Sequence, residues 1–292
     1  MSQPAPRIAV LPSDMKMGTR PGAIALDRLI WPLGVPEGIN GRTLSDLGPN
    51  DHLIVFPSKS LHVRPSFGTR ARVSIMVMEP PAIHGAHRRA LRWSWRRFFR
   101  VLSYDDALLG AIPNGIFFAH GGTWVPEWRD LILEKTRMIS LIASNKRSQE
   151  GHVLRHQIAD WARSDERDLD VMGRGYTPFD AKADGLAPYR YSVVIENGRV
   201  PNYFTEKLLD AVLCQTVPIY WGCPNVSDFL DTSGMIICDS ESALRQAIRD
   251  ISIEDYEARR PALTALQDKA DYFGDTLKRA AEAVRDAALS DL

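Results

Sequence analysis

Short apolar runs recur along the chain, with polar segments between them, and they predict a mostly parallel α/β protein. Most runs are continuous rather than alternating, which is typical of strands whose two sheet faces are both covered by helices. The expected strands are Arg7–Leu11, His52–Phe56, Arg72–Glu79, Met138–Ala143, Leu169–Met172, Tyr191–Glu196, Val217–Trp221 and Met235–Cys238.

Three of the intervening segments place apolar residues three or four positions apart, which is the spacing of an amphipathic helix. These segments are Gly151–Arg163, Thr205–Cys214 and Ser240–Ile251. The final segment, Ile253–Leu292, also has a helical pattern with polar faces. Because strands and helices alternate, the pattern favours helices packed on the faces of a mostly parallel sheet.

A stretch around Trp124–Glu134, which follows several Gly and Pro residues, separates the expected strands into two groups. At roughly 150 residues per domain, a chain of 292 residues is long enough for two compact units. We therefore expect an α/β protein with two sheet domains facing each other across a cleft, residues 1–130 and residues 131–292.

Composition argues against several classes of protein. The chain has 36 Lys and Arg against 36 Asp and Glu, so it lacks the basic excess of a nucleic-acid coat, and no nucleic-acid partner is expected. No run reaches the ~18–20 apolar residues of a membrane-spanning helix, and the first residues lack the pattern of a secretory signal. The three cysteines form no CxxC pair, which indicates neither a disulfide framework nor a zinc cluster. These features predict a soluble, cytoplasmic protein.

One segment, His87–Arg100, is strongly biased in composition, with six arginines interleaved with two Trp and two Phe. The simpler interpretation is a partly buried helix whose arginines extend into solvent around aromatic anchors. The alternative is a helix at the inner surface of a membrane, or a platform for an anionic substrate. The neutral charge of the whole chain favours the first interpretation and leaves peripheral membrane contact as the second.

Motifs of common cofactor sites are missing, because no GxGxxG follows a strand and neither GxxxxGK[ST] nor GxSxG occurs. His152 and His156 have the spacing of two metal ligands, but no third ligand is evident, and we expect both to be solvent-exposed. Asp168 and Asp170 form a DxD pair of the kind that clamps metals in some enzymes. Their charge-rich surroundings favour a solvated turn instead, so we expect no metal site.

The most informative polar cluster lies within Tyr189–Pro224, where a strand ends at Glu196 and a helix begins near Thr205. A helix N-terminus at the carboxyl end of a parallel strand offers free N–H groups and a positive dipole, which suit a phosphate. Lys207 adds a positive charge where the dipole favours an acid, which is explained if an anion binds there. The alternative is an ordinary capped helix, with Thr205 as N-cap and Glu206 offsetting the dipole.

This cluster carries a specific series of residues in order: Ile195, Glu196, Asn197, Tyr203, Thr205, Glu206, Lys207, Leu208, Ala211, Val217, Pro218 and Gly222. The series resembles the C-terminal signature of the α-1,3/4-fucosyltransferases of glycosyltransferase family 10. That signature runs roughly as a strand, F-E-N, Y-x-T-E-K-L, and then A and V-P-x-x-x-G. Many positions match in the proper order, so the resemblance is more specific than a single glycine motif.

The resemblance extends over residues 72–230. The segment after the strand Met138–Ala143 is similar to the family's Ser-Asn turn and arginine-bearing helix, with Ser144, Asn145 and Arg155 at the matching positions. The segment VMEPPAIH resembles the family's E-S-P segment, with Glu79 at its acid.

Three positions depart from the family pattern. Ile195 stands where the family has an aromatic residue, Gly198 where it has a serine, and Pro80 at the serine of E-S-P. These departures bear on which sugar and which acceptor the protein uses more than on the expected phosphate site.

The resemblance implies the GT-B fold, with two Rossmann-like domains. Residues 1–130 would form the acceptor side, and residues 131–292 would bind a nucleotide sugar, GDP-fucose. It further implies inverting transfer of fucose to a hydroxyl of a glycan acceptor, such as a bacterial surface polysaccharide or lipopolysaccharide. A same-fold enzyme that uses another GDP- or UDP-sugar is one alternative. A non-catalytic glycan- or membrane-surface-binding protein is another, and no oligomeric state is indicated.

The resemblance also implies roles for individual residues. Single displacement needs a base for the acceptor hydroxyl and positive charge for the leaving diphosphate. Glu79 would be the base, and Arg155 and Lys207 would bind the diphosphate in place of a metal. The remaining expected donor-binding residues are Ser144, Asn145, Glu196, Asn197, Tyr203, Thr205 and Glu206, with Glu206 at the ribose.

Overall fold

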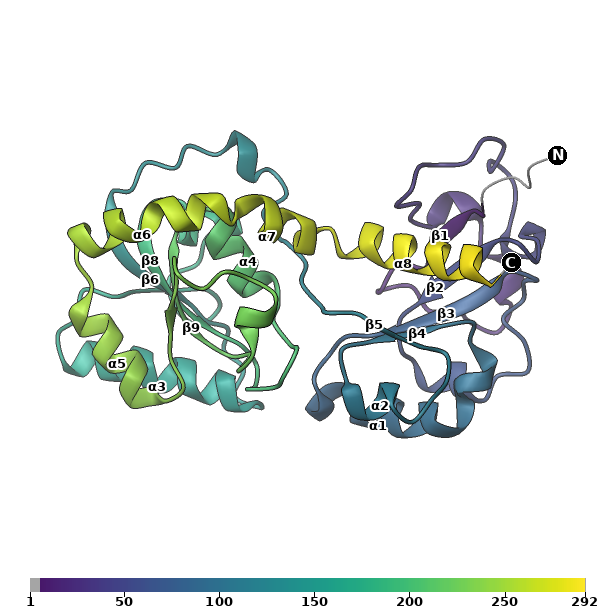
Figure 1. Cartoon of the computed structure of the whole chain (residues 1–292), viewed down its shortest axis with the longest axis horizontal. Coiled ribbons are helices and arrows are strands. Elements are labelled where there is room, and N and C mark those ends of the chain that lie inside the picture. The colour runs from purple at the N-terminus through teal and green to yellow at the C-terminus, as the bar shows by residue number, and fades with distance from the viewer. Residues whose placement is uncertain (1–5, 292) are drawn as a thin grey trace. The chain divides into compact units, whose positions relative to one another are not determined.

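The computed structural model describes residues 6–291, which form two compact units. The first unit comprises the residues up to Ala119 together with those from Thr276 onward, and the second comprises His120–Asp275. Each unit contains one five-stranded parallel sheet with helices on its faces (Figure 1). The expected fold class, α/β with two Rossmann-like domains, is therefore confirmed, and two such sheets are the organisation that the GT-B resemblance implies.

The sheet of the first unit follows chain order, β1-β2-β3-β4-β5, and every neighbouring pair is parallel. Its strands are β1 (Ile8–Val10), β2 (His52–Val55), β3 (Arg72–Val77), β4 (Val101–Ser103) and β5 (Gly115–Phe117). Helices α1 (Pro81–Ser94) and α2 (Asp106–Leu109) lie on one side of this sheet, and α8 (Thr276–Ser290) lies on the other (Figure 1). The first three strands confirm the sequence pattern, whereas β4 and β5 are too short and mixed to have been predicted from it.

Two apolar clusters explain why α8 belongs to the first unit. Along β1 and β2, Ala9 and Leu53 point into one cluster, while Ile8, Val10 and Ile54 point into the other. The second cluster is completed by residues of α8, namely Ala280, Ala281 and Val284, all fully buried. The domain boundaries expected from the sequence, residues 1–130 and 131–292, are therefore corrected at both ends.

The sheet of the second unit has the strand order β10-β9-β8-β6-β7, again all parallel. Its strands are β6 (Arg137–Ile142), β7 (Asp170–Met172), β8 (Tyr189–Ile195), β9 (Val217–Trp221) and β10 (Ile236–Ile237). Helices α3 (Glu150–Ser164) and α5 (Glu241–Asp250) lie on one face. On the other face lie α4 (Glu206–Leu213), α6 (Ile253–Ala265) and α7 (Gln267–Gly274) (Figure 1). All five strands and the three amphipathic helices predicted for this half are confirmed.

The arginine-rich segment His87–Arg100 is not one helix. Helix α1 ends at Ser94, a 3-10 turn covers Trp95–Arg97, and the chain then enters β4. Arg97 donates to the main-chain oxygen of Leu61, and Arg100 pairs with Asp291 at 2.7 Å. These contacts support the interpretation of a segment packed on its own unit. Among residues 6–291, no helix combines the length and apolarity needed to cross a membrane.

Candidate functional site

The connections of the second sheet create a switch point between β6 and β8. From β6 the chain passes through α3 to β7 at one edge, and it then returns to β8 on the opposite side of β6. In parallel α/β sheets, ligands bind at such a point, beyond the carboxyl ends of the strands. The two loops that leave this point lead to α3 and to α4, and these loops and helices together carry all of the donor-binding residues that the sequence predicts.

Glu196 fastens the start of α4 to the end of β8. Its side chain is fully buried and accepts hydrogen bonds from the Thr205 main-chain N–H and hydroxyl, both at 2.8 Å. The Thr205 hydroxyl oxygen accepts in turn from the main-chain N–H of Lys207, so Thr205 is the N-cap. The capped-helix interpretation is therefore confirmed for Thr205, and Glu196 positions the loop from beneath.

Lys207 is not an isolated cation. Its ammonium donates to the Thr205 hydroxyl oxygen at 3.1 Å and to Glu206 Oε1 at 3.0 Å, and it lies 3.7 Å from Glu196 Oε2. The charge imbalance that the sequence predicts at this helix start is thus offset by two carboxylates. About a quarter of the lysine side chain remains accessible, at 27% exposure.

The same contacts set the ionisation of these groups. Burial would raise the pKa of Glu206, but the charges of Lys207 and Lys182 outweigh it and lower the pKa to about 2. Burial raises the pKa of Glu196, a shift that the Lys207 ammonium opposes. Burial would lower the pKa of Lys207, and the two carboxylates raise it instead. Lys207 and Glu206 are consequently a charged pair at neutral pH.

Arg155 connects α3 to the same loop. Its guanidinium is buried, and Nε and Nη2 donate to the main-chain oxygen of Ile195, while Nη2 also reaches Asn197 Oδ1 at 3.2 Å. Its remaining amino group, Nη1, has no hydrogen-bond partner among residues 6–291. The arginine therefore anchors the loop with some of its donors and keeps others available.

The remaining predicted donor residues differ in accessibility. Asn145 is exposed and Ser144 half-buried in the loop after β6, where the Ser144 hydroxyl oxygen accepts from the Lys146 N–H at 3.4 Å. Tyr203 is only 1% exposed, with its ring centroid 5.9 Å from that of His120. Ser144 and Asn145 are therefore accessible at this loop, whereas the Tyr203 side chain is packed inside the unit.

Two glycines allow the backbone to close around Glu196. A Cβ atom on Gly151, in the first turn of α3, would lie 1.7 Å from the main-chain oxygen of Glu196. A Cβ atom on Gly222, directly after β9, would lie 2.6 Å from Glu196 Cγ and 2.5 Å from the Tyr220 hydroxyl. Since neither position has room for a side chain, the close approach of α3, β8 and β9 requires glycine at both.

A second buried ion pair lies one turn further along α4, and the sequence pattern missed it. Asp210 is fully buried and accepts a hydrogen bond from the Thr123 hydroxyl at 2.6 Å, while Lys182 Nζ lies 2.7 Å from it. The available signal was an acid within the otherwise apolar stretch of α4. The segment after Ala119 also contacts the second unit just before this helix, where the N–H of Gly121 donates to the main-chain oxygen of Phe204.

The histidine pair of α3 is buried, contrary to the expectation of exposed side chains. His156 Nδ1 lies 2.5 Å from the Tyr176 hydroxyl, and its Nε2 lies 3.1 Å from the main-chain oxygen of Lys146. Burial lowers the pKa of His152.

Asp170 of the DxD pair forms an ion pair with Arg137 at 2.9 Å. Within the described part of the chain, no three His, Cys, Asp or Glu side chains are grouped so that they could hold a metal ion.

Glu79, the expected base, lies in the first unit, two residues beyond the last residue of β3. Its side chain is partly buried. Its main-chain oxygen accepts from Arg88 Nη2 at 2.9 Å, and its N–H donates to His84 Nδ1 at 3.3 Å. The main chain of Glu79 is thus fixed by α1, and the carboxylate is at the carboxyl end of a central strand.

The geometry of the second unit agrees with a match to a known family. Residues 132–253 match the family model described as the C-terminal domain of glycosyltransferase family 10, the fucosyltransferases. Residues 132–253 form a glycosyltransferase family 10 domain. All nine expected donor-binding residues fall inside this family 10 domain, and they surround the β6–β8 switch point.

Several curated proteins are similar to parts of the chain. The α-(1,3)-fucosyltransferase FucT of Helicobacter pylori is 41% identical over 46 residues, which is 16% of this chain and 10% of that protein. The GDP-fucose protein O-fucosyltransferase 3 of Homo sapiens is 30% identical over 102 residues, 32% of this chain and 21% of that protein. The matched segments therefore span at most about a fifth of these relatives.

Solved structures similar to the chain include an α1,3-fucosyltransferase with GDP-fucose. That structure is 16% identical, covers 80% of each chain and has a TM-score of 0.47. The structure of TarM is 10% identical, covers 83% of this chain and 55% of TarM, and has a TM-score of 0.49.

Proposed function

We propose that the protein is an inverting glycosyltransferase that transfers fucose from GDP-fucose to a hydroxyl of a glycan, such as a surface polysaccharide or lipopolysaccharide. The observation that carries the proposal is the family 10 domain itself. The residues that match the family signature are gathered at the switch point of a parallel sheet, where ligands of such sheets bind.

The geometry supports two side chains, Lys207 and Arg155, as hydrogen-bond donors to the diphosphate of the nucleotide. An ammonium has three N–H donors, and Lys207 uses two on the Thr205 hydroxyl and Glu206, which leaves one for a phosphate oxygen. Arg155 contributes its Nη1 group, which is unused within residues 6–291. Charged donors fixed in advance by buried partners stabilise developing negative charge without reorganising. In this proposal no metal or other cofactor takes part.

Glu79 is the base in the proposal. A sugar hydroxyl is too weak an acid to attack unaided, so a carboxylate must accept its proton as the new glycosidic bond forms. The bond between the anomeric carbon and the diphosphate breaks in the same step, and GDP leaves with the electron pair. The hydroxyl attacks the face opposite the leaving group, which inverts the anomeric configuration.

The direct test is calorimetric binding and mass-spectrometric transfer with a panel of GDP-fucose, GDP-mannose and UDP-sugars. We expect GDP and GDP-fucose to bind more tightly than the UDP compounds, and fucose to be transferred or slowly hydrolysed. Tight binding of a UDP-sugar, without binding of GDP or GDP-fucose, would mean that the sugar donor is a UDP-sugar and not GDP-fucose. GDP binding without any turnover would favour a non-catalytic glycan-binding protein on this scaffold.

A further inference from the structure

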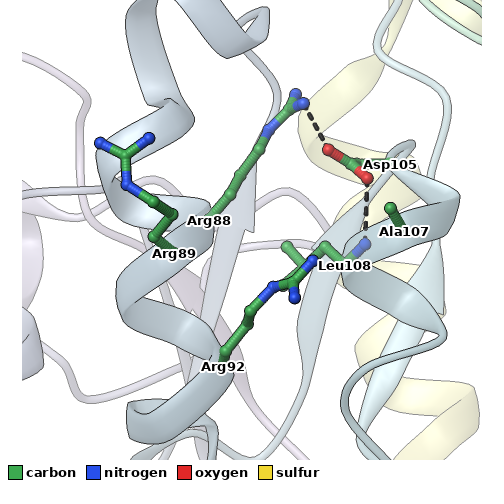
Figure 2. Close-up of a pocket in the computed structure, with 6 residues that line it drawn as sticks. All are labelled: Arg88, Arg89, Arg92, Asp105, Ala107 and Leu108. Atoms are coloured by element: carbon green, nitrogen blue, oxygen red, sulfur yellow. Dashed lines mark hydrogen bonds and ion pairs between the residues drawn. The ribbon is translucent and has the colours of Figure 1, made fainter.

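A hollow of about 470 Å³ lies in the first unit, between α1 and the segment Asp105–Leu108. It is lined by Arg88, Arg89, Arg92, Asp105, Ala107 and Leu108. Figure 2 shows the side chains of Arg88 and Arg92 extending from α1 toward that segment. None of the expected donor-binding residues lines this hollow.

The hollow has an excess of positive charge. Three arginines line it against one carboxylate, and that carboxylate is already paired, with Arg88 Nη1 2.5 Å from Asp105 Oδ2. Arg89 and Arg92 are exposed and have no ion pair or hydrogen bond with any residue in the described range 6–291. Two guanidinium charges are therefore uncompensated beside one concave surface.

Arg88 is held rigidly in the wall of the hollow. It is only 7% exposed; Nη2 donates to the main-chain oxygen of Glu79 at 2.9 Å, and its guanidinium lies 4.9 Å from the centroid of the Tyr104 ring. Its Nε is buried and has no hydrogen-bond partner among the described residues. A buried, fixed guanidinium whose Nε–H has no partner among the described residues is the kind of group that an oxyanion satisfies.

We propose that this hollow binds an oxyanion, a carboxylate or phosphate group, carried by the acceptor. Guanidinium groups recognise such oxyanions with paired hydrogen bonds, and Arg88 provides a direct link from the hollow to the main chain of Glu79. The assignment to the acceptor rests on the proposed function, in which Glu79 accepts the proton of the acceptor hydroxyl. The acceptor is thus an acidic or phosphorylated glycan rather than a neutral one.

The test uses the full chain saturated with GDP, with inorganic phosphate and D-glucuronate as probes. Binding is followed through the Nε–H signals of arginine in ¹H–¹⁵N spectra. In wild type, both probes should shift the signals of Arg88 and Arg92. The double variant Arg89→Gln/Arg92→Gln should bind about tenfold more weakly or worse, because two charge-assisted contacts are lost. The matched control is Arg96→Gln, an exposed arginine of the following turn that does not line the hollow, and it should bind like wild type.

Each result decides between the alternatives. The proposed oxyanion site would be refuted if the double variant bound the probes with unchanged affinity. It would also be refuted if the control variant lost as much probe affinity as the double variant. Binding to vesicles containing phosphatidylglycerol, with no response to either soluble probe, would overturn the acceptor assignment in favour of a lipid headgroup. GDP affinity should be equal in all variants. Probe binding that is lost in the double variant, together with no fucose transfer by wild type, would refute the proposed function and leave the oxyanion site standing.

Discussion

Four charged side chains at the start of α4 determine one another's ionisation. Glu196 and Arg155 are buried, while Glu206 and Lys207 lie above them at the accessible end of the helix. Lys207 is the common partner, within 3.7 Å of both carboxylates. A change at any one of these residues therefore alters the electrostatic environment of the others, and this coupling makes the cluster testable residue by residue.

Replacing Lys207 with methionine removes the ammonium and leaves Glu196 and Glu206 without their shared cation. We expect GDP affinity and transfer to fall, with a loss of about 2–4 kcal/mol of transition-state stabilisation. Isothermal titration with GDP and kcat/KM with GDP-fucose measure the two effects. Lys207→Arg keeps the charge and should retain most of the GDP affinity. Equal GDP binding by Lys207→Met and wild type would remove Lys207 from the diphosphate site.

The low pKa of Glu206 predicts a pH dependence of stability. Its pKa falls from the usual 4.5 to about 2 in the folded protein. The ionised carboxylate therefore stabilises the fold fully above about pH 4.5, and this contribution is lost as the pH falls toward 2. At pH 6, Glu206→Gln should lower the free energy of unfolding by about 2 kcal/mol. In urea titrations at pH 6, 4.5 and 3, the difference in the free energy of unfolding between wild type and Glu206→Gln should become smaller as the pH falls. A difference that stays constant would contradict the ion-pair argument.

Glu79→Gln tests the proposed base and keeps the main-chain oxygen that accepts the hydrogen bond from Arg88. Loss of a general base lowers turnover by roughly 10²–10⁴-fold. We expect that fall in kcat with unchanged GDP affinity, measured by transfer assay and calorimetry. Glu37→Gln, an exposed acid in the same unit, serves as the control. Full activity in Glu79→Gln would assign the base to another residue.

At the scale of elements, apolar runs predicted eight of the ten strands, and the bounds differ by a few residues at most. The two that were missed, β4 and β5, have three residues each. β4 follows the arginine-rich segment directly, where the helical pattern hides it. The clustering of Glu196, Thr205, Glu206 and Lys207 was predictable because these residues are close in sequence. Asp210 with Lys182 was not, because residues 28 positions apart meet only through the folding of the second unit.

Gly151 tests how closely α3 must approach β8. Because a Cβ at this position would lie 1.7 Å from the Glu196 oxygen, Gly151→Ala must push the helix away from the loop that Arg155 anchors. We expect a loss of about 2–4 kcal/mol of stability and weaker GDP binding. Gly198→Ala is the matched control, since its Cβ would meet nothing closer than Val200 Cγ2 at 3.9 Å. Chemical denaturation and GDP titration compare the two variants. Wild-type values for Gly151→Ala would show that α3 can shift at no cost.

At the scale of the whole molecule, the chain closes its first unit with its last helix. The first-unit strands carry apolar side chains on both faces, yet α1 and α2 lie on one side only. That imbalance was present in the sequence as continuous β-branched runs, but nothing local links Ile8 to a helix that begins at Thr276. Long-range pairing of this kind depends on the completed fold, so the boundary expected from the sequence placed α8 in the wrong unit.

This arrangement predicts that a defect in α8 acts on the first sheet and not on the family 10 domain. Val284 is fully buried in the apolar cluster that also contains Ile8, Val10 and Leu102, so Val284→Asp places an unpaired charge in that cluster at a cost of about 3 kcal/mol or more. Hydrogen exchange followed by mass spectrometry should show lost protection in peptides covering β1–β5. Peptides from residues 132–253 should keep their protection, and GDP affinity should be unchanged. Leu289→Asp makes the same substitution on the same helix at a position that is 52% exposed, and it should leave both units as in wild type. Equal loss of protection in peptides of both units would mean that the two cores unfold as one, because α8 would then stabilise the second sheet as much as the first.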